Sequence, residues 1–302
     1  MERIVPAAVF VNPAAGRGGA GRKVAEIRNA FARLKYAAKI VETASADEFR
    51  GEVRRALREG CATLIAMGGD GSLQVLVNEV LGHDVRVGVI PTGGGNDFAT
   101  ALGISKSMEK AVEIIVRGKT RLVDLVRVRN LRGLNVVYLG GGGIGIDAEA
   151  LRYANGRFAK WPGRLRYLAS AIAALRGFRG VEMAAEFPES DVPKVAKRLL
   201  LAAVLNTPTL GGGLRLAPEA RLDDGMLEVV MIEMLRNREV LALIPRLLIT
   251  GELRSKRAVR MRAVKIKLTA EQETSFQGDG ELLGKTPVEI EVLHPALRVL
   301  AP

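Results

Sequence analysis

The chain is poor in cysteine, histidine and aromatic residues. Among its 302 residues are one cysteine, Cys61, and two histidines, His83 and His294. A single cysteine excludes an internal disulfide, and the widely separated histidines lack the spacing of a zinc site. Cys61 lies in an apolar segment and is interpreted as a small core residue.

Acidic residues are outnumbered, with 33 Asp and Glu against 45 Lys and Arg, a net charge of +12. Such an excess suits an anionic lipid surface, nucleic acid or a polyphosphate, a solvated surface without a partner being the alternative. Aromatic residues make up 4% of the chain and form no basic–aromatic series of the kind that stacks bases. No nucleic-acid partner is therefore expected.

Long uncharged apolar runs are also lacking, so no transmembrane segment is predicted. The first residues show no signal-peptide pattern, and we expect a cytoplasmic protein. With 48% hydrophobic and 26% charged residues, the composition is globular, and the length is sufficient for two domains.

In the first half, apolar strand patterns alternate with helical ones, which predicts a doubly wound parallel sheet. Strands are expected at 4–11, 38–41, 62–67 and 85–90, and helices at about 24–34, 46–58, 73–81 and 108–116. In the second half, residues 264–269 and 288–292 alternate between apolar and polar, and 199–205 and 227–232 indicate buried strands. This change of pattern predicts a sandwich-like β domain, with the boundary near 125–133, where the pattern is interrupted.

Glycine-rich loops follow three of the predicted strands, at residues 12–18, 68–72 and 91–97. In open parallel sheets, ligands bind beyond the carboxyl ends of the strands. Glycine lets backbone N–H groups approach an anion closely, and a following helix adds the favourable end of its dipole. The three loops together predict a phosphate site, whereas one such loop alone would indicate no more than a tight turn.

Asp70 and Asp97 lie inside these loops. A carboxylate repels phosphate, so its presence here predicts a bridging cation such as Mg²⁺. Asp124 and Glu281 are further candidate ligands of this catalytic Mg²⁺. Ser72 is expected to cap the helix that follows it.

The loops resemble the three nucleotide-binding motifs of the diacylglycerol/sphingosine-type lipid kinases. The resemblance continues at residues 211–213, 218–220 and 224–227, and at Asp279-Gly280-Glu281, which is similar to the catalytic tripeptide of the bacterial members. These motifs occur in family order over nearly the whole chain. By them the chain is identified as a member of the bacterial diacylglycerol kinase-like family.

The resemblance implies an ATP-binding α/β domain of residues 1–128 with 296–302, and a β-sandwich-like lipid-substrate domain of residues 129–295. It implies ATP and Mg²⁺, with a structural Mg²⁺ held by Asp224 and the carbonyl groups of Arg221 and Met226. Nucleotide binding is carried onto Asn12, Pro13, Ala14, Ala15, Gly16, Thr43, Gly68, Gly69, Asp70, Gly71, Ser72, Gly93, Gly94, Gly95, Asn96 and Asp97. The chain departs from the family pattern at Gln74, Val75, Gly94 and Thr100.

Asp279 is the first candidate for the base that accepts the proton of the lipid hydroxyl, Glu281 is the second, and Asp70 completes the catalytic set. Phosphoryl transfer depends more on positioning and charge neutralisation than on a strong base. In an extended segment, Asp279 and Glu281 would point to the same side. A polar turn at 277–281 is the structural alternative.

Residues 151–181 contain no acidic residue, and an apolar series at helical spacing begins near Trp161. The basic residues are Arg152, Arg157, Lys160, Arg164, Arg166, Arg176 and Arg179, and the apolar series is Leu165, Leu168, Ile172 and Leu175. Such a helix suits an anionic membrane surface and predicts peripheral membrane association. The alternative is a helix that packs its apolar face on the β domain.

Taken together, these observations predict an ATP-dependent phosphotransferase that acts on the hydroxyl of a membrane lipid such as diacylglycerol. NAD kinase, which shares a Gly-Gly-Asp-Gly loop, and a non-catalytic nucleotide or lipid sensor are the alternatives. The lipid is left open among diacylglycerol, phosphatidylglycerol and a sphingoid base. The oligomeric state is open too, with a homodimer among the alternatives.

Overall fold

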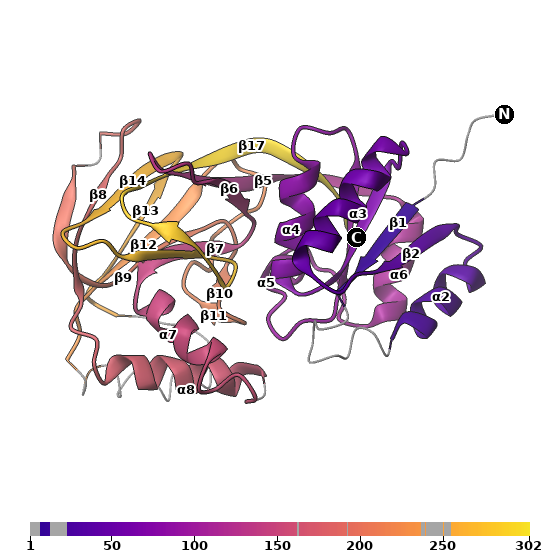
Figure 1. The fold of residues 1–302 in the computed structure, drawn as a ribbon. Coiled ribbons are helices and arrows are strands. Elements are labelled where there is room, and N and C mark those ends of the chain that lie inside the picture. Colours follow the sequence, from indigo (N-terminus) through magenta and orange to yellow (C-terminus); the bar gives the residue numbers. More distant parts are fainter. Residues whose placement is uncertain are drawn as a thin grey trace. The chain divides into compact units, whose positions relative to one another are not determined.

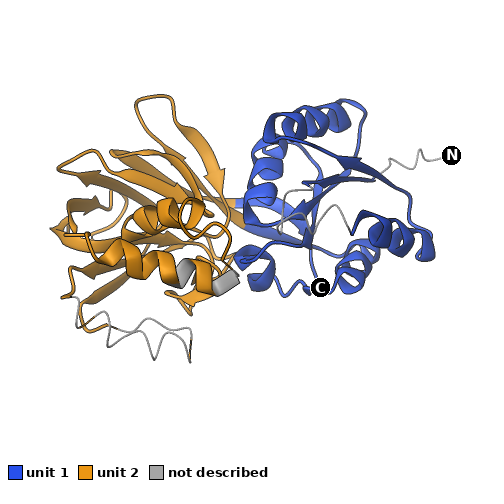
Figure 2. Cartoon of the chain, turned by 60° about the horizontal axis from the view of Figure 1, so that its bottom comes forward, with its two compact units in different colours: residues 1–123, 295–302 blue, residues 124–294 orange. Residues whose placement is uncertain are grey.

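The computed structural model describes residues 7–12, 23–161, 163–191, 193–236, 239, 250 and 255–302. The chain forms two compact units, residues 1–123 with 295–302 (unit 1) and residues 124–294 (unit 2) (Figure 2). It crosses from one unit to the other inside two strands, β5 (Thr120–Arg129) and β17 (Val288–Leu300).

Unit 1 contains a parallel sheet in the order β17, β4, β3, β1, β2. Its other strands are β1 (Ala7–Val11), β2 (Ala38–Glu42), β3 (Thr63–Gly68) and β4 (Arg86–Pro91). Every residue of β1 and β3 is buried, as expected for strands covered on both faces.

The helices of unit 1 cover both faces of this sheet, with α2 and α6 packed together and α3 and α4 packed together (Figure 1). They are α2 (Val24–Arg33), α3 (Ala46–Arg58), α4 (Asp70–Val80), α5 (Asp97–Ala101) and α6 (Met108–Arg117). In α3, Ser45 caps the start by accepting the N–H of Glu48 at 3.1 Å, and Phe49, Val53 and Ala56 are buried. A polar cap followed by an apolar face explains why this segment is helical.

Unit 2 is antiparallel, with the strand order β16, β15, β7, β9, β8, β14, β17. Strand β12 also pairs with β9 and β13, and β5 pairs with β17 and β6. The bounds are β6 (Asn135–Tyr138), β7 (Gly141–Gly145), β8 (Val181–Glu186), β9 (Val195–Leu205), β12 (Leu227–Glu233), β13 (Ala258–Ala263), β14 (Lys265–Ala270), β15 (Ser275–Gly278) and β16 (Glu281–Lys285). A two-stranded sheet is formed by β10 (Thr209–Leu210) and β11 (Leu214–Arg215).

Two apolar clusters form the core of unit 2. The larger one includes Tyr138 and Phe276 and lies within the strands, and the smaller one is lined by Leu201, Leu205 and Val230. Helices α7 (Ile146–Asn155) and α8 (Gly163–Leu175) pack together and contribute side chains to the smaller cluster. The helical pair therefore belongs to the core of unit 2 (Figure 1).

Strand β7 is unusual because it consists of four glycines and Ile144. A Cβ atom on Gly143 would lie 2.4 Å from the carbonyl oxygen of Ala202, and one on Gly142 would lie 2.6 Å from that of Gln277. The neighbouring backbones therefore approach β7 so closely that only glycine fits.

The predicted α/β plus β fold class is confirmed, and the predicted strands and helices of both halves are present. Strand β5 differs from the expectation at 125–133, because it continues to Arg129 and turns into β6 as a hairpin. The residues read as an interruption are thus the end of a strand and its turn.

Candidate active site

The three parallel strands β1, β3 and β4 end at the same edge of the sheet in unit 1. Asn12 follows β1, and its N–H donates to the carbonyl of Met67 at 3.4 Å. Pro13, Ala14, Ala15 and Gly16 lie outside the described residues. Thr43 is buried, and its hydroxyl donates to the carbonyl of Val11 at 3.2 Å.

The second loop continues directly into helix α4. Gly68 ends β3, Gly69 is the N-cap, and Asp70 begins the helix. Ser72 therefore lies in the first turn, and the expectation that it caps the helix is wrong.

The second and third glycine loops touch each other. The N–H of Thr92 donates to the carbonyl of Gly68 at 2.8 Å, and a Cβ on Gly93 would lie 2.5 Å from the Cα of Gly69. Both loops need glycine here because their backbones are in direct contact. Two of the loops found in the sequence therefore form one continuous backbone surface.

Asp70 binds the backbone of the third loop. Its Oδ2 accepts the N–H groups of Asn96 at 2.8 Å and Asp97 at 3.3 Å, and its Oδ1 accepts that of Phe98 at 3.4 Å. Burial, and next the carboxylate of Asp97, raise the pKa of Asp70 from 3.8 to about 6, although the three N–H groups oppose the rise. Two carboxylates, Asp70 and Asp97, are thus close enough for one to raise the pKa of the other.

These loops fit a cation and a phosphate. The Oδ1 atom of Asn96 and the Oγ1 atom of Thr92 are buried and have no hydrogen-bond partner among the described residues, and a polar ligand would satisfy them. Groups of three or more His, Cys, Asp or Glu that could hold a metal ion are absent from the described ranges. A cation at Asp70 and Asp97 would therefore take its remaining ligands from phosphate oxygens and water.

In unit 2, Asp279 and Gly280 form the two-residue turn between β15 and β16. Both have positive φ, +52° and +83°, as in a type I′ hairpin turn, and Gly278 pairs with Glu281 across it. The expectation that Asp279 and Glu281 point to the same side of an extended segment is therefore wrong. The polar turn that stood as the alternative is present, and it carries Asp279.

The carboxylate of Asp279 is held by three backbone N–H groups between β6 and β7. Oδ2 accepts the N–H of Leu139 at 2.7 Å, and Oδ1 accepts those of Gly140 at 2.8 Å and Gly141 at 3.3 Å. The N–H of Asp279 in turn donates to the carbonyl of Gly141 at 2.9 Å. Charge-assisted bonds of this kind fix the position of a carboxylate.

Gln277, in β15, supports the same turn through its side chain. Its side chain is buried, donates to Oδ2 of Asp147 at 2.8 Å and accepts the N–H of Gly280 at 3.2 Å. Burial raises the pKa of Asp147 to about 6, and the bond from Gln277 and two backbone N–H groups oppose the rise. Within the described part of the chain, Oδ1 of Asp147 has no hydrogen-bond partner. Sequence reasoning missed Gln277, Asp147 and the amides of 139–141. The four consecutive glycines at 140–143 were the available signal.

Glu281 begins β16 and is exposed, and partial desolvation raises its pKa. Asp124 is completely buried where β5 enters unit 2. Its Oδ1 lies 2.6 Å from Nδ1 of His294, and its Oδ2 accepts the N–H of Gly225 at 2.8 Å. These contacts give Asp124 a structural role. Its partner is His294, which is not expected from the sequence to be a metal ligand.

Asp224 lies in the turn before β12. Its Oδ1 accepts the N–H of Met226 at 3.1 Å, and its Oδ2 is paired with the guanidinium of Arg262. Arg221 has its guanidinium 3.8 Å from Asp223. Of the implied metal ligands, Asp224 thus has an arginine side chain beside it, and the metal site at Asp224, Arg221 and Met226 stays a prediction.

Two family models match successive parts of the chain. Residues 6–128 match the diacylglycerol kinase catalytic domain, and residues 140–301 match the YegS C-terminal NAD kinase beta sandwich-like domain. The chain belongs to the diacylglycerol kinase-like lipid kinase family. The recognition made from the motifs is confirmed, and the enzyme is a phosphotransferase with an alcohol group as acceptor.

Two curated relatives of this lipid kinase match it over nearly their whole length. A diacylglycerol kinase of Mycobacterium tuberculosis (strain H37Rv) is 29% identical over 300 residues, which cover 97% of this chain and 94% of the relative. A diacylglycerol kinase of Bacillus subtilis is 26% identical over 299 residues, which cover 98% and 96%. A crystal structure of a diacylglycerol kinase from Bacillus anthracis has a TM-score of 0.73 at 19% identity, covering 100% of this chain and 98% of that one, which shows a shared fold.

Proposed function

We propose that this lipid kinase transfers the γ-phosphate of ATP to the hydroxyl of a membrane lipid, with diacylglycerol as the first candidate. The relatives named diacylglycerol kinases support the choice of lipid. The observation that carries the proposal is the carboxylate of Asp279, which three backbone N–H groups hold at the tip of a hairpin. An acceptor alcohol needs such a fixed carboxylate for its proton.

Unit 1 supplies the phosphate side of the reaction. The joined loops at Gly69 and Gly93 present backbone to a polyphosphate, and helix α4 adds its N-terminal dipole. Asp70 and Asp97 would hold Mg²⁺, which neutralises phosphate charge when bound. The buried acceptors of Thr92 and Asn96 would bind water or donors of this hydrated ligand.

Unit 2 supplies the acceptor side. The O–H bond of the lipid hydroxyl breaks and its proton passes to the carboxylate of Asp279, while the alcohol oxygen forms a bond to the γ-phosphorus. The bond between that phosphorus and the β–γ bridging oxygen breaks, and ADP leaves with the electron pair. Because the transition state is loose, the task of Asp279 is to orient the hydroxyl and take up its proton late in the reaction.

Asp279→Asn tests this assignment. The amide keeps the size of the side chain but cannot take up the proton, so we expect turnover to fall by about 10²–10⁴-fold. Nucleotide affinity should stay near that of the wild type because Asp279 lies in unit 2. Undiminished turnover would remove Asp279 as the base.

The acceptor is identified with radiolabelled ATP and a panel of diacylglycerol, phosphatidylglycerol, a sphingoid base and NAD. Label in a lipid supports the proposal, and the lipid with the largest kcat/KM is the substrate. Label in NAD alone, or in no compound, would refute it. If the protein were a non-catalytic nucleotide or lipid sensor, no compound would gain label.

We also propose that the start of helix α8 contacts an anionic membrane. The C-terminal end of α8 packs on the core, because Leu175 and the following Phe178 contact the smaller apolar cluster. At the other end, Trp161 and Leu165 are 47% and 54% exposed.

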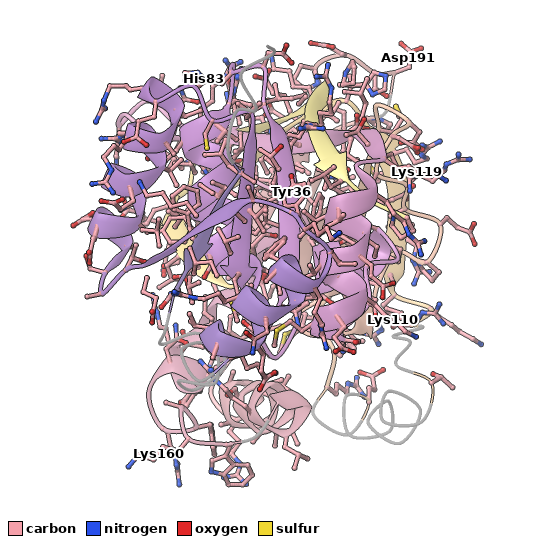
Figure 3. All side chains as sticks on the ribbon, turned by 90° about the vertical axis from the view of Figure 1, so that its right-hand side faces the viewer. Tyr36, His83, Lys110, Lys119, Lys160 and Asp191 are labelled. Atoms are coloured by element: carbon pink, nitrogen blue, oxygen red, sulfur yellow. The ribbon has the colours of Figure 1, made fainter. Side chains whose placement is uncertain are left out.

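The same end of the helical pair is basic. Arg157, whose guanidinium lies 5.7 Å from the ring centroid of Phe158, is exposed, and Lys160 points away from the protein surface (Figure 3). Arg166 instead bonds the carbonyl of Ala154 at 2.9 Å and has a structural role. Exposed apolar side chains beside cations suit the interface of an anionic bilayer. Of the helices in the part of the chain that the structure describes, none is long and apolar enough to cross a membrane.

Vesicle sedimentation tests the membrane surface. We expect binding to anionic vesicles that weakens with salt, and replacing Trp161 and Leu165 with alanine should weaken it at least about tenfold, since each loses apolar burial. Leu131→Ala is the matched control, because Leu131 is fully exposed at the tip of another hairpin of the same unit. Equal losses in the two proteins, or salt-insensitive binding, would contradict the assignment.

A further inference from the structure

The turn that precedes β12 has a structural task in unit 2. The carbonyl of Leu222 accepts the N–H of Asp124 at 2.6 Å, and the N–H of Gly225 donates to the carboxylate of Asp124 at 2.8 Å. Asp124 is completely buried and lies where the chain enters the unit. The turn at 222–226 therefore has to keep its shape if Asp124 is to stay in place.

Two carboxylates meet beside this turn. Asp224 belongs to the turn itself, and Glu228 lies in the second position of β12, with side chains that are 22% and 12% exposed. Without a cation, the repulsion between these groups would strain the turn.

The cation is supplied by the chain. Arg262 of β13 is the direct cross-strand neighbour of Glu228, and its Nε lies 3.1 Å from the carboxylate of Glu228. Its Nη2 is paired with Oδ2 of Asp224. A guanidinium is planar, permanently charged and rich in N–H donors, so one side chain can bind both carboxylates.

A divalent cation does not fit beside this arrangement. Oδ1 of Asp224 accepts the N–H of Met226 at 3.1 Å, and Oδ2 is in contact with the guanidinium. A metal ion at Asp224 would have to compete with the guanidinium of Arg262 for Oδ2, and the positive charge of Arg262 would oppose its binding.

We propose that the guanidinium of Arg262 takes the place of a structural divalent cation at this turn, so that unit 2 needs no metal ion there. The charge is positioned by the pairing of β12 with β13 rather than by coordination. This inference concerns the folded protein without nucleotide or lipid, so it stands or falls independently of the proposed reaction.

The test compares melting temperatures of nucleotide-free wild type and Arg262→Gln in EDTA and in a titration of MgCl₂ or CaCl₂. The wild type should melt at the same temperature in EDTA and in the presence of the metal ion. A metal ion that binds at Asp70 would raise the melting temperature of every variant equally, and this common shift is subtracted. Arg262→Gln should melt about 2–4 °C lower in EDTA and regain this loss as the metal ion is added, because ligand binding to the folded state stabilises it. Adding Asp224→Asn to Arg262→Gln should abolish the regain.

Arg132→Gln is the matched control, because Arg132, in the turn between β5 and β6, also pairs with a carboxylate, that of Glu273 in the loop before β15, and is well exposed. It should show neither the loss nor the metal response. If Arg262→Gln yields no folded protein, Arg262→Lys keeps the charge on a smaller group and should show a smaller loss with little metal response.

Three results would overturn the proposal. The first is a wild type that loses stability in EDTA and recovers it with metal ions in a manner that Asp224→Asn abolishes. The second is an Arg262→Gln protein as stable as the wild type in EDTA. The third is a destabilised Arg262→Gln protein that does not respond to metal ions, because the guanidinium would then not occupy a cation site.

Discussion

Replacing Asp70 with asparagine should make the ligand-free protein more stable at neutral pH while it impairs the enzyme. The folded protein raises the pKa of Asp70 from 3.8 to about 6, mainly by burial. A carboxyl group with a raised pKa binds its proton more tightly in the folded state, so the free energy of unfolding falls as pH rises from 3.8 to 6. Above pH 6 the ionised carboxylate therefore works against folding.

The size of the effect follows from the two pKa values. A pKa difference of about 2 units between the folded and unfolded states corresponds to about 3 kcal/mol, since each pKa unit is worth about 1.36 kcal/mol. Asparagine removes this cost, but its single carbonyl oxygen cannot accept all of the N–H groups of Asn96, Asp97 and Phe98, a loss of about 1 kcal/mol. Asp70→Asn should thus gain about 2 kcal/mol at pH 8, and near pH 4 it should be slightly less stable than the wild type.

Urea unfolding in EDTA at several pH values between 4 and 8 measures how the stability difference between Asp70→Asn and the wild type changes sign with pH. Asp191→Asn, at an exposed position, is the control and should change stability little at any pH. Adding Mg²⁺ and ATP should stabilise the wild type far more than Asp70→Asn, because the carboxylate that costs stability is the one proposed to hold the cation. A variant that is no more stable than the wild type at pH 8 in EDTA would refute the reasoning.

Two further predictions follow from the packing of glycines and from the support of the turn that carries Asp279. Gly93→Ala should destabilise the protein by about 1–3 kcal/mol in urea unfolding and weaken nucleotide binding, because its Cβ would lie 2.5 Å from a backbone Cα atom. The control Gly51→Ala, whose Cβ would have no atom within 4 Å, should stabilise helix α3 by about 0.5–1 kcal/mol. Equal nucleotide affinities of the two variants in binding assays would contradict this prediction. Gln277→Leu should lower kcat with unchanged nucleotide affinity, since the turn loses its N–H acceptor and Asp147 loses its donor; unaltered kcat in steady-state kinetics would show that the turn needs no such support.

The parallel half of the fold was predictable because its signals are local. Unbroken apolar runs such as 62–67 are typical of strands covered on both faces, and the helices between them carry a regular apolar stripe. The joined loops at Gly69 and Gly93 were predictable as a pair for the same reason: parallel strands end at one edge of the sheet.

What the sequence did not predict depends on contacts between distant residues. Strand β7 is mostly glycine, and its strand conformation follows from how closely β9 and β15 approach it. The sequence left an extended segment and a polar turn open for Asp279 and Glu281, because the positive φ of Asp279 is stabilised by amides about 140 positions earlier in the chain. Arg262 meets Asp224 only because β12 and β13 pair in one register.

The shared strand β17 has a consequence for how the protein is made. Its last residues, Pro295–Leu300, lie beside β4 in the parallel sheet, yet they follow all of unit 2 in the chain. During synthesis the parallel sheet of unit 1 must therefore wait, with one edge of β4 uncovered, until the ribosome has translated the whole of unit 2. A chain interrupted anywhere within unit 2 leaves neither half of the enzyme finished.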